Sequence, residues 1–476
     1  MKESKMKSSI FKGNITPALL VITSAFLIVI YGLLFILLLQ LNYSQRQTVS
    51  EKSIHVSEAG VNYYRWHLAH DPEDFSDGTG QPGPYEHEYF DPQGNAVGKF
   101  SLEITPPEAG SSIVTIRSTG WTYEYPNLRR VVSVQYGIPS FAKYSFLSNA
   151  SSWYGSGITV NGLIHSNNGI RMDGTNTSLV TSYQEEYICG SETGCLPPTP
   201  KPGVWGSGGD QGLWQFPASW IDFDSISVDL TNMRDAAQTG GLYLGSSGKS
   251  GYHLIFANDG SFTVKKVESV SSIKGYSVPG EGLGSEGQGG CRNLPQVITT
   301  EVTLGTYSIT DTPIVFVEDN LWVEGTIRGR ITVAAATFPI QSSNVDVWIR
   351  GNLTYTAYDG SDVLGLVSQN NIFFARDIPN DFKVDAVLMA QKGKIIRHRY
   401  TNSLCRTNVY GSIKNSLTIN GALINYYKSY WNYTSYLGLI SGFTTRTVNY
   451  DTHLLYAPPP YFPTAGEYEF ISWREE

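Results

Sequence analysis

The residue types that could perform acid–base chemistry gather between positions 318 and 350 of the sequence. A carboxylate can transfer protons, and a guanidinium group beside it can stabilise developing negative charge, as cleavage of a polysaccharide requires. The candidates are Glu318, Asp319, Glu324, Arg328, Arg330, Asp346 and Arg350. The sequence contains no GxSxG nucleophile elbow and no Cys–His pattern for covalent catalysis.

A repeated seven-residue motif contains two of these candidates, Glu324 and Arg350. It reads apolar, Thr or Trp, Val or Ile, polar, Gly, any residue, apolar. Its four copies are LWVEGTI (Leu321–Ile327), VWIRGNL (Val347–Leu353), ITVNGLI (Ile158–Ile164) and LTINGAL (Leu417–Leu423). The polar place changes between Glu, Arg and Asn, whereas the apolar places and the glycine persist. We therefore expect Glu324 and Arg350 to form a structural salt bridge between adjacent turns of a scaffold, and we assign no catalytic residue.

The glycines of the motif are expected to form corners with positive φ. They are Gly162, Gly325, Gly351 and Gly421. The first and third places of the motif lie on one side of a strand and are expected to face inward. Apolar runs from Val363 and Val384 fill the interval between copies, so the repeat is roughly 20–30 residues long, which predicts a solenoid of the right-handed parallel β-helix type. Chance matches in a β-sandwich are the alternative.

A tyrosine-rich segment, NYYKSYWNYTSY (Asn425–Tyr436), could stack on sugar rings or pack against the ends of the solenoid. The alternative functions are therefore a glycan-binding adhesin and a surface-anchored carbohydrate-active enzyme. A glycan is accordingly one partner class that the residues allow.

The composition of the 476-residue chain favours a mainly β protein of roughly two to four folding units. Charged residues make up 16% and hydrophobic residues 41%, with 48 Gly, 30 Tyr and 10 Trp. Low charge with many glycines and aromatic residues is typical of turn-rich β structure. The net charge of −8 and the lack of a basic aromatic patch argue against nucleic-acid binding.

The four cysteines are Cys189, Cys195, Cys291 and Cys405, and none forms a CxxC pair, which argues against a zinc site. Outside the cytoplasm we expect a local disulfide between Cys189 and Cys195 and a second one between Cys291 and Cys405, with free thiols as the alternative. The aspartates that follow position 70 miss the EF-hand spacing. No metal and no cofactor is expected.

The N-terminal part of the chain predicts a membrane anchor. Residues 1–16 are basic, and residues 17–41 form an uncharged, mostly apolar stretch long enough to cross a bilayer. No cleavage site of a signal peptide follows it. By the positive-inside rule the N-terminus is cytoplasmic, and the body lies outside the cytoplasmic (inner) membrane. The helix is expected to continue through residues 42–70 and to end at Asp71-Pro72.

The remaining chain divides into three predicted regions. Residues 71–150 are expected to hold a small antiparallel sheet from the runs VGKFSLEI, SSIVTIRSTGW and RRVVSVQYG, packed on the exposed half of the helix. Residues 151–457 form the β-helix-like body, with an irregular insertion at about 173–300. Residues 458–476 are a C-terminal tail.

Two sets of residues each resemble a known family. SEAGVNYYRWHL, in the outer part of the helix, resembles the minor-pilin-like proteins of the PilX N-terminal class from type IV pilus systems. The runs VGKFSLEI, RSTGW, VNGLIHSNNGI, VEDNLWVEGTIRGRITVAA, LGLVSQNNI and YDTHLLYAPPPYFP resemble a DUF4900-like family of bacterial envelope proteins with a β-helical body. The resemblance implies a role in assembly or at the surface, with pilus or other envelope assembly proteins as partners, and it assigns no catalytic residue.

The sequence departs from true prepilins in one respect. Gly13-Asn14 stands where a prepilin has a Gly-Phe-like cleavage point, and the following NITPALLV contains no glutamate. The chain is therefore expected to stay unprocessed in the membrane. The function predicted from the sequence is that of a non-catalytic, single-pass structural protein of the envelope or of a pilus-like assembly.

Overall fold

The computed structural model describes residues 15–108, 111–223, 229–278, 288–339, 345–401, 405, 410–464 and 467–476. The chain forms two compact units. The first comprises Met1–Pro106, Val114–Tyr136 and Phe470–Glu476, and the second comprises Pro107–Ile113 and Gly137–Glu469. The basic residues expected in the cytoplasm before residue 15, and Gly13-Asn14, lie outside the described residues.

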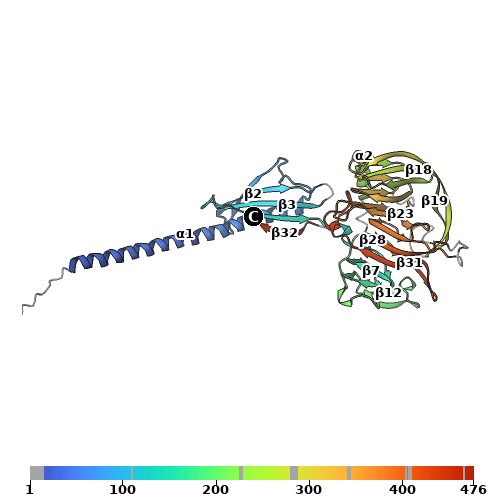
Figure 1. Cartoon of the computed structure of the whole chain (residues 1–476), viewed down its shortest axis with the longest axis horizontal. Helices are drawn as coiled ribbons and strands as arrows, with labels where there is room; N and C mark the ends of the chain where they lie inside the picture. Colours follow the sequence, from blue (N-terminus) through green and yellow to red (C-terminus); the bar gives the residue numbers. More distant parts are fainter. Residues whose placement is uncertain are drawn as a thin grey trace, which may run out of the picture. The chain divides into compact units, whose positions relative to one another are not determined.

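The first unit begins with a single 56-residue helix, α1 (Ile15–His70). It ends where the sequence predicted, because a residue before proline disfavours the helical conformation. Its first part is long and apolar enough to cross a membrane, and the side chains there are exposed. The first buried side chain is Val49, and from that point one side of the helix packs against a sheet. The anchor and the extended helix are therefore one continuous element (Figure 1).

The sheet of the first unit has five strands in the order β1-β2-β3-β4-β32. They are β1 (Tyr85–Phe90), β2 (Ala96–Thr105), β3 (Ile113–Thr122), β4 (Arg130–Gly137) and β32 (Glu469–Glu475). The pairs β1–β2 and β2–β3 are antiparallel, and β2, β3 and β4 coincide with the three predicted runs. Sequence analysis missed β1, which is half exposed, and wrongly treated the last residues as a separate tail, although β32 completes this sheet.

Glycines allow the helix and the sheet to approach closely. A Cβ atom on Gly120 of β3 would overlap the backbone of Ser57 in α1, and one on Gly60 of α1 would overlap the ring of Phe100. The Ser57 hydroxyl donates a hydrogen bond of 2.6 Å to the carbonyl of Ser118. This buried contact fixes α1 on the sheet, because the small residues admit a backbone-to-backbone distance that larger side chains would prevent.

The second unit consists mainly of short parallel strands that stack in three rows. Row 1 contains β17 (Gly251–Phe256), β21 (Leu321–Ile327), β23 (Val347–Tyr355), β25 (Ile372–Phe374), β27 (Ile395–Ile396) and β29 (Ser429–Tyr430). Row 2 contains the second halves of β21 and β23, then β26 (Asp381–Ala390), β28 (Ile413–Asn425), β31 (Gly438–Asn449), β7 (Ile158–Asn161) and β10 (Thr175–Asn176).

Row 3 runs beside row 2 and uses the second halves of β26 and β28. Its members are β16 (Leu242–Leu244), β20 (Ile314–Val317), β22 (Arg330–Ala335), β24 (Val363–Ser368), the ends of β26 and β28, β5 (Phe146–Ser148), β8 (Ile164–Ser166), β11 (Val180–Ser182) and β15 (Trp214–Gln215). A separate parallel sheet holds β6 (Ser152–Tyr154), β9 (Ile170–Met172) and β14 (Val204–Trp205). Each turn of the chain therefore visits three strand positions in succession.

The chain enters this stack in the middle. Strands β5 to β15 build one end, and α2 (Asp229–Gly240) then precedes β16 at the other end. From β16 the turns return until β28 and β31 pair with β5 and β7. We call this join between the late and the early turns the seam.

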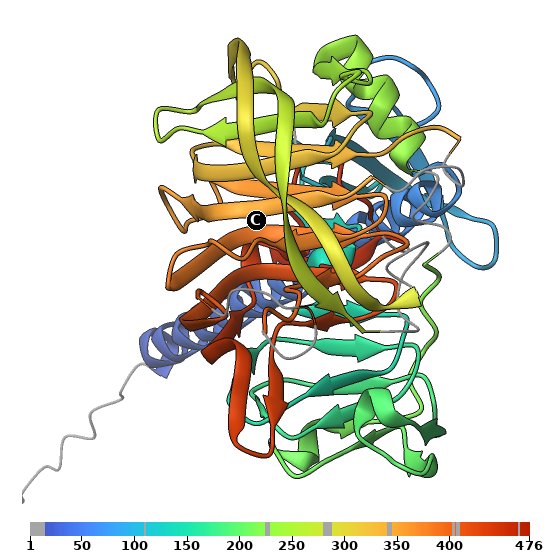
Figure 2. The ribbon, with the colours of Figure 1, turned by 90° about the vertical axis from the view of Figure 1, so that its right-hand side faces the viewer.

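The region expected to be an irregular insertion, 173–300, is ordered for the most part in the described residues. Strands β10, β11, β14 and β15 extend the stack, and each is only two or three residues long, too short to show an alternating pattern in the sequence. A long antiparallel hairpin follows, made of β18 (Ser261–Ser277) and β19 (Gly290–Ser308). Figure 2 shows this hairpin, in yellow, lying across the stacked strands.

The main core lies inside the three rows, and the first and third places of all four motif copies are buried in it, as predicted. Two further clusters cover the outer faces. Trp322 and Trp348, at the second place of the motif, pack beneath the β18–β19 hairpin with Val267 and Leu294. The outer face of row 3 packs against α2.

We expect Gly120→Ala to lower the free energy of unfolding by about 2 kcal/mol, because the added methyl group must displace the backbone of α1. Thermal unfolding of the full chain in detergent, followed by circular dichroism, measures the change. Gly240→Ala is the matched control, since a Cβ there meets no atom within 4 Å. Equal unfolding temperatures for the two variants would contradict close packing at Gly120.

Candidate ligand-binding cavity

The motif occurs at two different positions of the stack. The copies at Leu321 and Val347 lie directly beside each other in row 1. The copies at Leu417 and Ile158 lie in row 2, where Arg446 of β31 stands between them. The motif is thus suited to two kinds of corner, each with buried first and third places.

The polar place of the motif links successive turns. Arg350 Nε lies 3.6 Å from Glu324 Oε1, which confirms the predicted salt bridge. In row 2, Asn161 donates to Asn449, Asn449 to Asn420, and Asn420 to buried Asp385, at 2.8, 2.8 and 2.6 Å. The polar residues at this place therefore form ladders that hold the register of the strands.

The four motif glycines do not share one conformation. Gly162, Gly325 and Gly421 have φ values of 152°, 123° and 142°, as expected for the corner. Gly351 does not have a positive φ, so the prediction is wrong there. Its partner strand runs from Val323 to Gly325 while β23 runs from Ile349 to Leu353, so β23 carries extra residues. A Cβ on Gly351 would overlap the Glu324 side chain, and space is the requirement at this position.

The other candidates for acid–base chemistry serve different parts of the stack. Asp319 accepts hydrogen bonds from the backbone and hydroxyl of Ser247. Asp346 accepts from the side-chain amides of Asn370 and Asn371. Arg330 donates to backbone carbonyls of residues 360, 457 and 458. Within the described ranges, no group of three or more His, Cys, Asp or Glu side chains could hold a metal ion.

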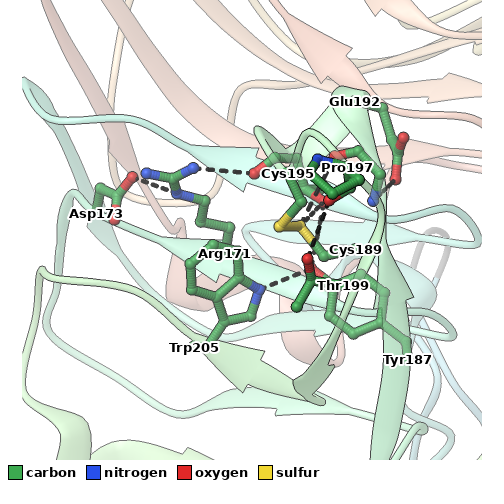
Figure 3. Close-up of a disulfide and its surroundings, with 11 residues drawn as sticks. Arg171, Asp173, Tyr187, Cys189, Glu192, Cys195, Pro197, Thr199 and Trp205 are labelled. Carbon is green, nitrogen blue, oxygen red and sulfur yellow. Dashed lines mark hydrogen bonds and ion pairs between the residues drawn. A yellow bond between two sulfur atoms is a disulfide. The ribbon is translucent and has the colours of Figure 1, made fainter.

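The structure joins Cys189 to Cys195 and Cys291 to Cys405. The first bridge closes the loop between β12 (Glu186–Cys189) and β13 (Thr199–Pro202). Figure 3 shows it beside Arg171 and Trp205, with Glu192 on the closed loop. The second bridge spans 114 residues and joins Cys291, at the start of β19, to Cys405, which follows β27 in the chain. A covalent link of this length removes much conformational freedom from the unfolded chain.

A cavity of about 770 Å³ lies at the seam. Rows 2 and 3 pair across the seam, whereas β29 at the end of row 1 forms no ladder with β6. The two turns separate at that place and the interior of the stack opens. The volume falls within the range of about 300–1,000 Å³ that is usual for small-molecule sites. The lining includes Trp153, Arg171, Glu192, Tyr430, Tyr433 and Arg446.

One wall of the cavity is a rigid group around Asp173. This carboxylate accepts hydrogen bonds from Trp153 Nε1 at 2.8 Å and from Arg171 Nε at 2.7 Å. Burial disfavours the charged carboxylate, but the hydrogen bonds from Trp153 and Ser207 outweigh it and lower the pKa of Asp173. The Arg171 guanidinium lies between the rings of Trp153 and Trp205, at 4.2 and 4.8 Å. These contacts fix the orientation of the Trp153 indole.

Arg446 occupies a place in row 2 where an aliphatic residue is expected. Its neighbours in register are Leu417 and Ile158. Burial lowers the pKa of Arg446 to about 10, so the side chain still carries its charge at pH 7. It donates one hydrogen bond of 3.1 Å to the carbonyl of Ser156, and its Nε atom is buried without a partner. No carboxylate pairs with it in the part of the chain that the structure describes.

The tyrosine-rich segment contributes to the cavity in part. Tyr430, Trp431 and Tyr433 line it, but Trp431 is only 3% exposed and packs on Phe374 inside the core. Tyr436 is 95% exposed. Sequence analysis missed Trp153 and Arg171, which no motif marks. It also missed Arg446, whose signal is a charge at the apolar place of the run TRTVN.

We expect Glu324→Gln to lower the free energy of unfolding by about 1–2 kcal/mol at pH 7. His253, and then Arg350, hold the pKa of Glu324 below its ordinary value although burial opposes them. A depressed folded-state pKa stabilises the protein above the unfolded value of 4.5, and this contribution disappears as pH falls through the folded-state pKa. The difference from the unmodified protein should therefore shrink below about pH 4.5.

Denaturant unfolding at several pH values, followed by tryptophan fluorescence, tests this expectation. Glu103→Gln is the control, because Glu103 forms an exposed pair with Arg117 and should change stability by less than about 0.5 kcal/mol. A pH-independent loss in Glu324→Gln would show that charge does not carry the effect.

Comparisons with known proteins add little to this description. A scan with family models finds no match, and a search of curated proteins finds none either. Among solved structures, the crystal structure of the competence-associated pilin ComZ from Thermus thermophilus is similar at a TM-score of 0.29 and 12% sequence identity, covering 90% of this chain and 98% of that one.

Proposed function

We propose that this protein is a non-catalytic, membrane-anchored structural component of the cell envelope, related in role to minor pilins. The observation that carries the proposal is α1. One part of this helix is uncharged and exposed from Ile15 to Gln45, and the other part is docked under the sheet of the first unit. A helix of this kind can hold the protein in a bilayer and transmit that position rigidly to the folded unit.

The exposed stretch of α1 also offers a surface for neighbouring helices. It carries apolar side chains on all sides, and the hydroxyls of Thr23 and Ser24 bond to carbonyls of the preceding turn. In lipid, such helices associate through van der Waals packing. The resemblance of the SEAGVNYYRWHL stretch to the PilX N-terminal class supports partners of the pilus-assembly type. Without a prepilin cleavage point, the protein stays in the membrane.

We infer that the second unit is a β-helix-like solenoid. The three parallel rows, the inward first and third places of the motif and the polar ladders at its fourth place support this assignment. The repeat would make the unit a stiff body for display at the surface, as the resemblance to DUF4900-like envelope proteins implies. Its handedness is expected to be right-handed.

A role without catalysis is supported by the contacts of the candidate carboxylates, which bond to other residues of the protein. Asp319, Glu324 and Asp346 are all engaged by residues of adjacent turns, and each has a structural task. The rival function, a carbohydrate-active enzyme, requires a carboxylate that can exchange a proton with a ligand. The cavity wall offers Asp173 and Glu192, and Asp173 is saturated by the donors described above.

Placement of the body outside the cytoplasm is supported by two independent features. Lysines at positions 2, 5, 7 and 12 precede the helix, and positive charge marks the cytoplasmic side of a membrane anchor. All four cysteines are in disulfides, which persist in oxidising compartments.

Cysteine labelling tests the orientation, because the native chain has no free thiol. Tyr436→Cys should react with a membrane-impermeant maleimide in intact spheroplasts, since residue 436 is 95% exposed. Ser9→Cys, in the segment expected in the cytoplasm, should react only after the membrane is permeabilised. The reverse pattern would overturn the orientation.

Photo-crosslinking tests the assembly role. With p-benzoylphenylalanine at Phe26 or Phe35, which are 65% and 63% exposed, we expect adducts with the N-terminal helices of other envelope proteins. The same probe at Tyr64, which is 0% exposed, should give no such adduct. Mass spectrometry identifies the joined peptides. If Phe26 and Phe35 capture lipid alone, α1 is an anchor and not an assembly surface.

A further inference from the structure

We propose that the seam cavity binds an acidic saccharide, with a carboxylate of the sugar on Arg446 and a sugar ring on the indole of Trp153. This inference concerns the second unit and stands apart from the assembly role of α1. Three properties of the cavity carry it: an uncompensated cation, a fixed aromatic surface, and an excess of positive over negative charge among the lining residues.

Arg446 provides a charge that lacks a counter-ion. Arg446 is half-buried, and a cation partly removed from water costs free energy unless it is paired. The neighbouring turns avoid this cost by placing Leu417 and Ile158 at the same position. In the described residues Arg446 has only carbonyl contact, to Ser156. A guanidinium group binds a carboxylate through parallel N–H···O hydrogen bonds. A ligand carboxylate in the cavity would supply the missing partner.

Trp153 provides the aromatic surface. Its side chain is 44% exposed and borders the cavity, yet its orientation is set by the hydrogen bond to Asp173 and by the guanidinium of Arg171. Little conformational freedom remains to be lost when a ligand binds. The C–H face of a pyranose ring is apolar and flat enough to pack on an indole, which combines a large apolar face with a polar edge.

The remaining lining favours a hydroxylated, negatively charged ligand. Ser156, Ser429 and Thr434 border the cavity and offer hydroxyl groups to the hydroxyls of a sugar. Its charged lining residues are four cations and two carboxylates: Arg171, Arg399, Lys428, Arg446, Asp173 and Glu192. This local excess contrasts with the net charge of −8 for the whole chain. A neutral saccharide would leave Arg446 unpaired, so an acidic one is favoured.

Calorimetric titration of the full chain in detergent micelles tests the proposal. The probes are a trimer of galacturonic acid, the same trimer with its carboxyl groups reduced to alcohols, and a tripeptide of glutamate. We expect the acidic trimer to bind at least tenfold more tightly than the reduced trimer and than the peptide. Trp153→Ala should weaken binding of the acidic trimer at least tenfold. Trp220→Ala is the matched control, because Trp220 is 54% exposed and lies outside the cavity lining.

Arg446→Leu separates binding from folding. It restores the aliphatic residue of the neighbouring turns, so we expect a higher unfolding temperature without ligand together with loss of binding of the acidic trimer. A lower unfolding temperature would show that Arg446 has a structural task instead. Equal binding of the acidic and reduced trimers, or acidic-trimer binding that survives both Arg446→Leu and Trp153→Ala, would overturn the proposal. Tighter binding of the glutamate peptide would assign the cavity to a protein ligand.

Discussion

Strand β28 holds the second unit together, because it pairs on both of its edges with parts of the chain that are far apart in sequence. One edge binds β26 over ten residue pairs, from Asp381↔Ser416 to Ala390↔Asn425. The other edge binds β31 and then β5, so early and late turns become one stack. A shift of one residue along β28 would move its apolar side chains from the core to the outer face. The asparagine ladder that includes Asn420 opposes such a shift, since it pairs only in one register.

The cavity is a consequence of how the two runs of chain meet. In rows 2 and 3 the backbone ladder continues across the seam, but in row 1 the last turn leads through Trp431 into the hairpin of β30 (Tyr433–Ser435) and β31. β29 and β6 are therefore not joined by a backbone ladder, and residues of both strands line the cavity. Arg446 can occupy an inward place there because the neighbouring space is open, whereas the same residue deeper in the stack would meet aliphatic side chains on every side.

Much of the scaffold could be predicted from the sequence, but most of the residues that line the cavity could not. The motif predicted which side chains face inward and the Glu324–Arg350 pair, since both depend on residues within one or two turns. The cavity joins residues such as Trp153 and Tyr430, which are brought together by stacking alone, and no local period encodes that. Strands β10, β11, β14 and β15 escaped notice for a related reason: two or three residues are too few to show an alternation. Gly351 failed as a corner because β23 bulges, which depends on its partner strand.

Both units are completed by residues that leave the ribosome late. Strand β32 adds to β4 in the first unit, and β31 closes on β7 in the second, in each case across more than half of the chain. During synthesis β4 and β7 each have one edge without its partner strand. Unpaired strand edges are sites of non-native pairing and aggregation. The anchor helix meanwhile is ready first. The helix that begins the chain is therefore synthesised long before the last strand of either folded unit.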